Sequence, residues 1–236
     1  MLREILQKLP VEQRLRLRSH VQRVWALPYH RDLDRLARIY RTDKASTEHA
    51  YTRYYLRHLP PRRAVRSVLE IGVGGVNSKF GYASAFGGQS LRMWRDYFPH
   101  AEIVGLDIER KRVPGNRITV VQGSQDDPQL LARIAHEHGP FDVVIDDGSH
   151  VAAHLTASHA ALFEHVRPGG VYVIEDLATA YIPAAGGGPP GTAGTSIELL
   201  KSAIDDVMRS HWDAASDRAA VDEVHVYDEI AFLVRH

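Results

Sequence analysis

The 236-residue sequence contains no cysteine. This absence excludes a disulfide framework, thiolate-bound metals and a cysteine nucleophile, and it fits a cytoplasmic location. The sequence also lacks a run of about 18 apolar residues, the length that a membrane-spanning helix needs. Charged residues are scattered among the apolar positions of the N-terminus, and the apolar region of a secretory signal would not tolerate them. We therefore expect a cytoplasmic protein that does not cross a membrane.

The net charge is zero, but it is unevenly distributed. Residues 1–66 carry 16 Lys and Arg against 6 Asp and Glu, so this segment is basic and the remainder acidic. A basic segment can bind nucleic acid or a membrane surface. It can also be a solvated helical face, or a surface that docks on an acidic domain or subunit. We favour these latter interpretations, because the segment lacks blocks of Lys and Arg interleaved with aromatics, and we expect it to mediate formation of a homo-oligomer.

Apolar spacing divides the chain into a helical start and an α/β remainder. Residues 1–60 have apolar side chains at helical spacing, with one helix expected over Asp32–Tyr40. From residue 61 onward, short apolar runs alternate with helical or loop segments, which predicts a parallel sheet covered by helices on both faces. The expected strands are Ser67–Ile71, Glu102–Leu106, Ile118–Gln122, Phe141–Ile145, Gly170–Ile174, Glu223–Tyr227 and Ile230–Arg235. The last two predict a hairpin that adds an antiparallel strand to the sheet.

A glycine-rich turn follows the first expected strand. Gly72 and Gly74 would let the backbone approach a ligand closely, and Glu70 precedes them. Asp107 ends the second strand, where a carboxylate can accept both hydroxyls of a ribose. The interval from Gly72 to Asp107 exceeds the roughly 20 residues of a dinucleotide fingerprint, because 76–90 is inserted. This spacing argues against NAD and favours S-adenosylmethionine (SAM). A tight turn followed by a surface aspartate remains the alternative.

Acidic residues end two later strands. Asp146 and Asp147 follow one strand, with His150 three residues further on, and Glu175 and Asp176 follow the next. Carboxylates that converge at one sheet edge repel one another unless a cation or protons offset their charge. Oxygen ligands select a hard ion such as Mg²⁺ or Mn²⁺, and a nearby histidine suits a general base. The alternative is that these acids only cap helices or stabilise turns.

Six segments in this order resemble the metal- and SAM-dependent sugar O-methyltransferases of antibiotic biosynthesis, such as the mycinamicin and related macrolide-sugar enzymes. The segments are Arg41–Lys44, Val68–Gly75, Gly88–Trp94, Gly105–Asp107, Ile145–His150 and Tyr172–Leu177. The resemblance covers about residues 38–182. It implies a class I methyltransferase fold, Rossmann-like, with seven strands of which the last is antiparallel. The first 35 residues match no motif of this family.

The resemblance also implies roles for single residues. Asp147, Glu175 and Asp176 would bind Mg²⁺, and His150 would be the catalytic base. Vicinal hydroxyls of the acceptor would chelate the metal, which lowers the alcohol pKa. We assign SAM binding to residues at the sheet edge, namely Glu70, Gly72, Gly74, Ser90, Asp107, Gln125 and Asp146. Tyr181 would offer a face to the sugar, and the Gly- and Pro-rich segment 183–196 would be a mobile loop that closes over the acceptor.

The acceptor that we expect is a small glycosylated molecule carrying a deoxysugar. A catechol-like phenol or an amine is an open alternative, since a catechol places its oxygens much as a diol does. An RNA methyltransferase or a silent SAM-binding protein is a further alternative, suggested only by the basic segment 1–66.

Overall fold

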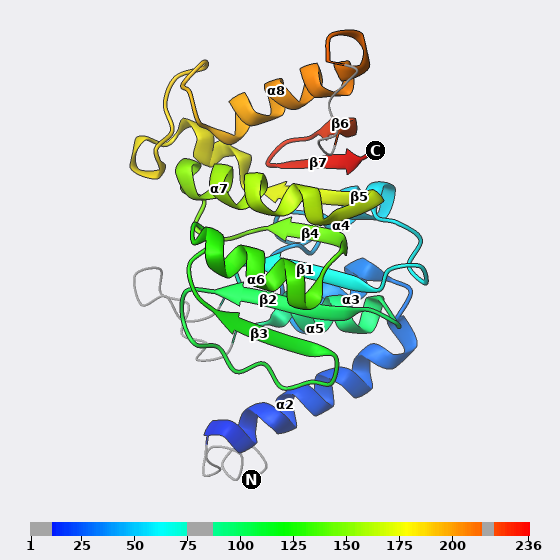
Figure 1. Cartoon of the computed structure of the whole chain (residues 1–236). Helices are drawn as coiled ribbons and strands as arrows, with labels where there is room; N and C mark the ends of the chain where they lie inside the picture. The colour runs from blue at the N-terminus through cyan, green and yellow to red at the C-terminus, as the bar shows by residue number, and fades with distance from the viewer. Residues whose placement is uncertain (1–10, 75–86, 214–219) are drawn as a thin grey trace.

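The computed structural model describes residues 11–74, 87–213 and 220–236, and its centre is a seven-stranded sheet (Figure 1). The strand order is β3-β2-β1-β4-β5-β7-β6. The five strands from β3 to β5 run parallel, and β7 is antiparallel to both β5 and β6. The strands are β1 (Ser67–Ile71), β2 (Glu102–Asp107), β3 (Ile118–Gln122), β4 (Phe141–Asp146), β5 (Val166–Glu175), β6 (Val221–Val226) and β7 (Ile230–Arg235). The expected α/β fold and its terminal hairpin are confirmed.

Helices cover both faces of this sheet. They are α2 (Val11–Ala26), α3 (Leu33–Tyr40), α4 (Thr52–His58), α5 (Gln89–Tyr97), α6 (Pro128–His138), α7 (Ala152–Leu162) and α8 (Ser196–Val207), with the short 3-10 helices η1 (Leu27–Tyr29), η2 (Phe163–His165), η3 (Leu177–Tyr181), η4 (Pro183–Ala185) and η5 (Arg209–His211). Figure 1 shows α6 and α7 in front of the sheet and α3 and α5 behind it.

The strands are apolar on both faces because both faces are covered. Val68 belongs to the apolar layer that includes residues of α3, α4 and α5, whereas its neighbour Leu69 belongs to the layer that includes residues of α6, α7 and α8. Val143 and Val144 of β4 alternate in the same way. Side chains of consecutive strand residues point to opposite faces, so the alternation builds two separate apolar layers. The same alternation places the acidic side chains at the strand ends on opposite faces of the sheet.

The N-terminal helices α3 and α4 are part of the core. Leu36 and Tyr40 of α3 and Tyr55 of α4 are fully buried, in the same apolar layer as Val68. The expected helix over 32–40 is confirmed as α3, which begins after Asp32 because that side chain accepts a hydrogen bond from the Arg35 N–H. A domain boundary near residue 60 stays a prediction, and residues 1–10 lie outside the described part of the chain.

The parallel strands bring their carboxyl ends to one edge. The chain order reverses between β1 and β4, which creates the crevice where α/β sheets bind ligands. The loops after β1, β2, β4 and β5 all begin there. The segment 183–196, expected as a loop, contains η4 and turns before α8 begins. Among the described residues no helix is long and apolar enough to cross a membrane.

Candidate active site at the carboxyl edge of the sheet

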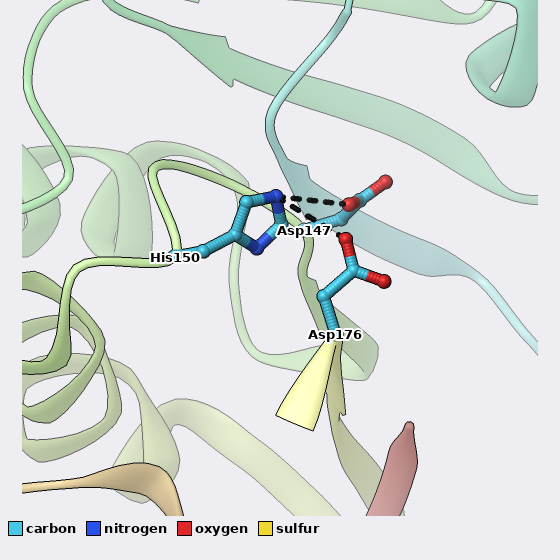
Figure 2. Close-up of side chains that lie close together, drawn as sticks. All are labelled: Asp147, His150 and Asp176. Carbon is cyan, nitrogen blue, oxygen red and sulfur yellow. Dashed lines mark ion pairs between the residues drawn. The ribbon is translucent and has the colours of Figure 1, made fainter. Parts of the chain in front are cut away.

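Asp147, His150 and Asp176 converge at the ends of β4 and β5 (Figure 2). The Nε2 atom of His150 lies 3.4 Å from Oδ2 of Asp176 and 4.0 Å from Oδ1 of Asp147. One ligand atom from each of the three residues lies within 4.8 Å of the other two. All three side chains are part-buried, with 21 to 30% of each side chain exposed. This geometry agrees with the prediction from the sequence that the two acidic strand ends meet and that His150 lies beside them.

Two of these residues have a strained backbone. His150 has a φ of 57° and Asp176 a φ of 56°. Residues other than glycine adopt this left-handed conformation rarely, at a cost of roughly 1 to 3 kcal/mol each. The strain lets the chain turn directly at the strand ends, which directs both side chains toward the same point.

Glu175, the third predicted metal ligand, faces a different set of groups. Its Oε2 accepts a hydrogen bond from Nζ of Lys44 at 2.6 Å, and its Oε1 accepts one from the hydroxyl of Tyr55. The same Lys44 ammonium donates to Oδ2 of Asp147 at 2.7 Å and lies 3.4 Å from Oε1 of Glu70. Lys44 is therefore a buried cation that joins three carboxylates, and it links Glu175 to Asp147.

Burial dominates the electrostatics of this group. It raises the pKa of the Glu175 carboxyl well above its usual range, and it also raises that of Asp147, although Lys44 opposes both shifts. Burial likewise raises the pKa of Glu70 to about 7, again against the pull of Lys44. For Lys44 itself burial acts to lower the pKa, but the nearby carboxylates outweigh it and raise the pKa well above the usual value. The ammonium form of Lys44 is thus firmly held.

Sequence reasoning missed three residues of this site, all from the N-terminal segment. Lys44 belongs to a segment that carries the family resemblance, but it was assigned no role. The hydroxyl of Tyr51 donates to Oδ1 of Asp176 at 2.8 Å, and that of Tyr55 donates to Glu175. Their burial and pairing depend on α3 and α4 packing under the sheet, for which the sequence of this segment holds no local signal.

The glycine turn lies directly beside this cluster. A Cβ at Gly72, where φ is 90°, would lie 1.8 Å from the backbone oxygen of Asp147. Gly72 is therefore required because the loop after β4 passes against the end of β1. Gly74 has a φ of 66° and open space where its Cβ would be. Gly75 and residues 76–86 of the insertion lie outside the described residues.

The remaining predicted cofactor residues on this side surround the turn. The Asp107 carboxylate accepts hydrogen bonds from the Val73 N–H at 3.1 Å and the Glu109 N–H at 2.8 Å, so it is held at the end of β2 beside the glycines. Ser90 is buried in the first turn of α5, and Glu70 is buried in β1. These positions lie around the glycine turn, and their role in binding SAM stays a prediction.

The side chains of Asp146 and Gln125 form a buried hydrogen-bonded pair. The Asp146 carboxylate accepts hydrogen bonds from Nε2 of Gln125 at 3.1 Å, from the hydroxyl of Tyr172 at 3.0 Å and from the hydroxyl of Ser158. Oε1 of Gln125 accepts one from the Ser149 N–H at 2.7 Å. Their contacts within the protein position the loop after β4, and a direct role in cofactor binding stays a prediction.

Tyr181, the predicted sugar contact, ends η3, the helix that follows Asp176. Its side chain is exposed, with 48% of the residue accessible. Of the other histidines near the site, His154 lies 3.5 Å from Asp126 and hydrogen-bonds Ser149. Tyr181 therefore faces solvent, whereas His154 lies in the first turn of α7 and binds the loop that carries His150 through Ser149.

The donor chemistry of the acidic cluster fits a divalent cation. Asp147 and Asp176 each direct one carboxylate oxygen toward the same point beside His150, while Lys44 and Tyr51 bind the other oxygen. Hard oxygen donors in this arrangement suit Mg²⁺ or Mn²⁺. Two carboxylates that lie close together in a part-buried site also repel each other, and a positive charge between them offsets this repulsion.

No protein-family model matches the chain. It is 46% identical over 212 residues to mycinamicin VI 2''-O-methyltransferase of Micromonospora griseorubida, and 45% identical over 213 residues to demethylmacrocin O-methyltransferase of Streptomyces fradiae. Each match covers 86% of this chain and 52% of the relative. Among solved structures it is similar to the MycE methyltransferase from the mycinamycin biosynthetic pathway in complex with Mg, SAH and mycinamycin VI, with a TM-score of 0.77 and 46% identity over 86% of this chain and 53% of that one.

These comparisons confirm the resemblance that the six segments predicted. They also confirm the class I methyltransferase fold, since the TM-score against MycE accompanies high sequence identity. The chain spans about half the length of the curated relatives it matches.

Proposed function

We propose that this chain, a member of the sugar O-methyltransferase family of antibiotic biosynthesis, is a Mg²⁺-dependent enzyme. It would transfer a methyl group from SAM to a sugar hydroxyl of a glycosylated natural product. The observation that carries the proposal is the convergence of Asp147, His150 and Asp176 beside the glycine turn of β1. The 46% identity to a mycinamicin sugar methyltransferase supports the acceptor class.

Each residue of the cluster has a distinct task in this proposal. Nε2 of His150 would take the proton of the acceptor hydroxyl. Asp147 and Asp176 hold the cation, with Glu175 as the third ligand that the resemblance implies. A bound divalent cation lowers the pKa of a chelated diol and orients one of its oxygens. SAM would supply the methyl group: as the acceptor oxygen bonds the methyl carbon, the bond from that carbon to the sulfonium sulfur would break and S-adenosylhomocysteine would leave.

The crevice between β1 and β4 would hold SAM. Asp107 would accept the ribose hydroxyls, while Gly72 and Gly74 allow the backbone to approach the cofactor. Ser90 and Glu70 would complete one wall, and the Asp146–Gln125 pair would fix the other. Tyr181 would stack on the sugar. We further propose that the protein acts in the cytoplasm as a homo-oligomer, with the basic N-terminal segment at the contact between copies.

Methyl transfer measured with and without metal tests the proposal. The chain is incubated with SAM and a panel of macrolide and polyketide glycosides, and products are detected by mass spectrometry. We expect turnover with Mg²⁺, none in EDTA, and none for D147N with Mg²⁺. The matched variant D126N, which changes an aspartate outside the cluster, should keep turnover. Activity undiminished by EDTA would contradict the metal role.

The same panel tests the acceptor class. Catechols and amines are included beside glycosides that carry vicinal hydroxyls and glycosides in which one of these hydroxyls is already methylated. Preference for the free diol supports the proposal, since a blocked diol cannot chelate. Equal or better turnover of catechols or amines would contradict the sugar acceptor while leaving the metal role intact.

A further inference from the structure

Lys44 is buried among the acids to a degree that the proposed chemistry does not explain. Its side chain is 1% exposed, and its ammonium has carboxylate oxygens of Asp147, Glu175 and Glu70 at 2.7, 2.6 and 3.4 Å. A buried ammonium loses several kcal/mol of hydration, which only well-placed negative partners offset. Lys44 and the three carboxylates are thus interdependent.

The ammonium binds two of the carboxylates that are expected to hold the divalent cation. Oδ2 of Asp147 and Oε2 of Glu175 both accept hydrogen bonds from Lys44, while Oε1 of Glu175 is bound by Tyr55. Both oxygens of Glu175 are therefore engaged within the protein. For Glu175 to act as a metal ligand, one of these two hydrogen bonds must lengthen or break.

We propose that Lys44 is a positioning residue that acts as a built-in counter-cation: it keeps Asp147 and Glu175 assembled without metal and competes with a divalent cation for the negative charge of these two carboxylates. The inference rests on the proposed metal site. A fixed positive charge within about 5 Å of a divalent cation repels it, whatever the exact coordination, and removal of that charge removes the repulsion. Lys44 therefore stabilises the metal-free fold while weakening metal binding.

The variant K44M separates these two effects. The side chains have similar length, so the change removes the charge with little loss of volume. In EDTA we expect a lower melting temperature than for the wild type, because three buried carboxylates lose their cation. Isothermal titration with MgCl₂ should give a dissociation constant at least about tenfold smaller for K44M than for the wild type. Added Mg²⁺ should raise the melting temperature of K44M more than that of the wild type.

Two further variants serve as controls. K44R keeps the charge and should keep a Mg²⁺ affinity close to that of the wild type. K111M removes a mostly buried lysine that pairs with Glu109 outside the cluster, and it should leave Mg²⁺ affinity unchanged. A purely structural role of Lys44 predicts lower stability without tighter metal binding.

The possible outcomes decide between the two claims. If the wild type binds no Mg²⁺ at all, the proposed function fails. If the wild type binds Mg²⁺ and K44M binds it equally or more weakly, the counter-cation proposal alone fails. A K44M protein that folds only when Mg²⁺ is added supports the proposal. One that stays unfolded at saturating Mg²⁺ contradicts it, because the divalent cation should then replace the ammonium.

Discussion

Asp146 and Asp147 are neighbours in the chain, but the protein buries their carboxylates by opposite means. Asp146 points toward α7, where Gln125, Tyr172 and Ser158 donate neutral hydrogen bonds to it. Asp147 points to the other face, where its partners are the Lys44 ammonium and His150. The alternation of side chains at the end of β4 separates the two environments.

The difference indicates which acid is available for chemistry. Asp146 has several donors and is nearly inaccessible, so it needs no further ligand. Asp147 keeps one oxygen directed toward His150, and its surroundings contain more negative than positive groups. A neutral hydrogen-bond network fixes structure, whereas an acidic cluster with open oxygens attracts a cation. Variants on each side should therefore fail in different ways.

The largest expected effect is on the Asp147 side, at His150. In H150A the proton acceptor is lost, so we expect kcat to fall by about 10² to 10⁴. Binding of SAM should remain, since His150 is not among the residues proposed to bind SAM. Initial rates at saturating SAM and Mg²⁺ measure the first effect, and calorimetric SAM binding measures the second. H154A, which changes a histidine in the first turn of α7, should keep most of the rate, and an equal loss would rule out a specific base.

On the Asp146 side the expected effect is on stability. D146A removes the buried carboxylate that accepts hydrogen bonds from Gln125, Tyr172 and Ser158, so we expect the free energy of unfolding to fall by roughly 3 to 5 kcal/mol. Y172F removes only one donor and should cost about 1 kcal/mol. Urea denaturation in EDTA measures both. If D146A unfolded as easily as the wild type, the structural role of the network would be wrong.

The sheet could be predicted closely because its strands are near-continuous apolar runs. Five expected strands begin and end within one residue of those observed. The strand β5 is longer than expected, since Val166 pairs with Phe141 before a register shift. The intervening Arg167-Pro168-Gly169 has the composition of a loop. Pairing with a neighbouring strand overrode that local signal.

The site could be predicted only where residues follow strand ends directly. Asp147, His150 and Asp176 meet because parallel strands share an edge, a consequence of topology alone. The orientation of Glu175 depends on Lys44, which is 131 residues away in the sequence. No periodicity or motif spacing encodes such a contact. The N-terminal contribution therefore became visible only in three dimensions.

A pH dependence sharpens the contrast further. Near Asp146, burial lowers the pKa of His159 to about 4 from a usual 6.5, despite the opposing pull of Asp206. Between pH 6.5 and 4, the unfolded chain therefore binds a proton at His159 that the folded protein does not bind. The contribution of neutral His159 to the free energy of unfolding is fully present above pH 6.5, and it is lost as the pH decreases toward 4. We expect this group to cost about 2 to 3 kcal/mol by pH 4. Urea melts at several pH values should show a shallower loss for H159Q, whereas H136Q, at an exposed position, should behave like the wild type.

The smallest expected effect tests the Asp147 side with a neutral donor. Y51F removes the hydrogen bond to Oδ1 of Asp176 but no charge, so this carboxylate becomes less well oriented and Mg²⁺ affinity should fall about tenfold. Calorimetry measures it, with Y54F as the matched control because the hydroxyl of Tyr54 contacts Arg53 and no acid of the cluster. Equal affinities in Y51F and Y54F would contradict the orienting role. Loss of the charged donor Lys44 should tighten metal binding, whereas loss of the neutral donor Tyr51 should weaken it. Changes of Mg²⁺ affinity in opposite directions would therefore separate the effect of charge from the effect of carboxylate orientation.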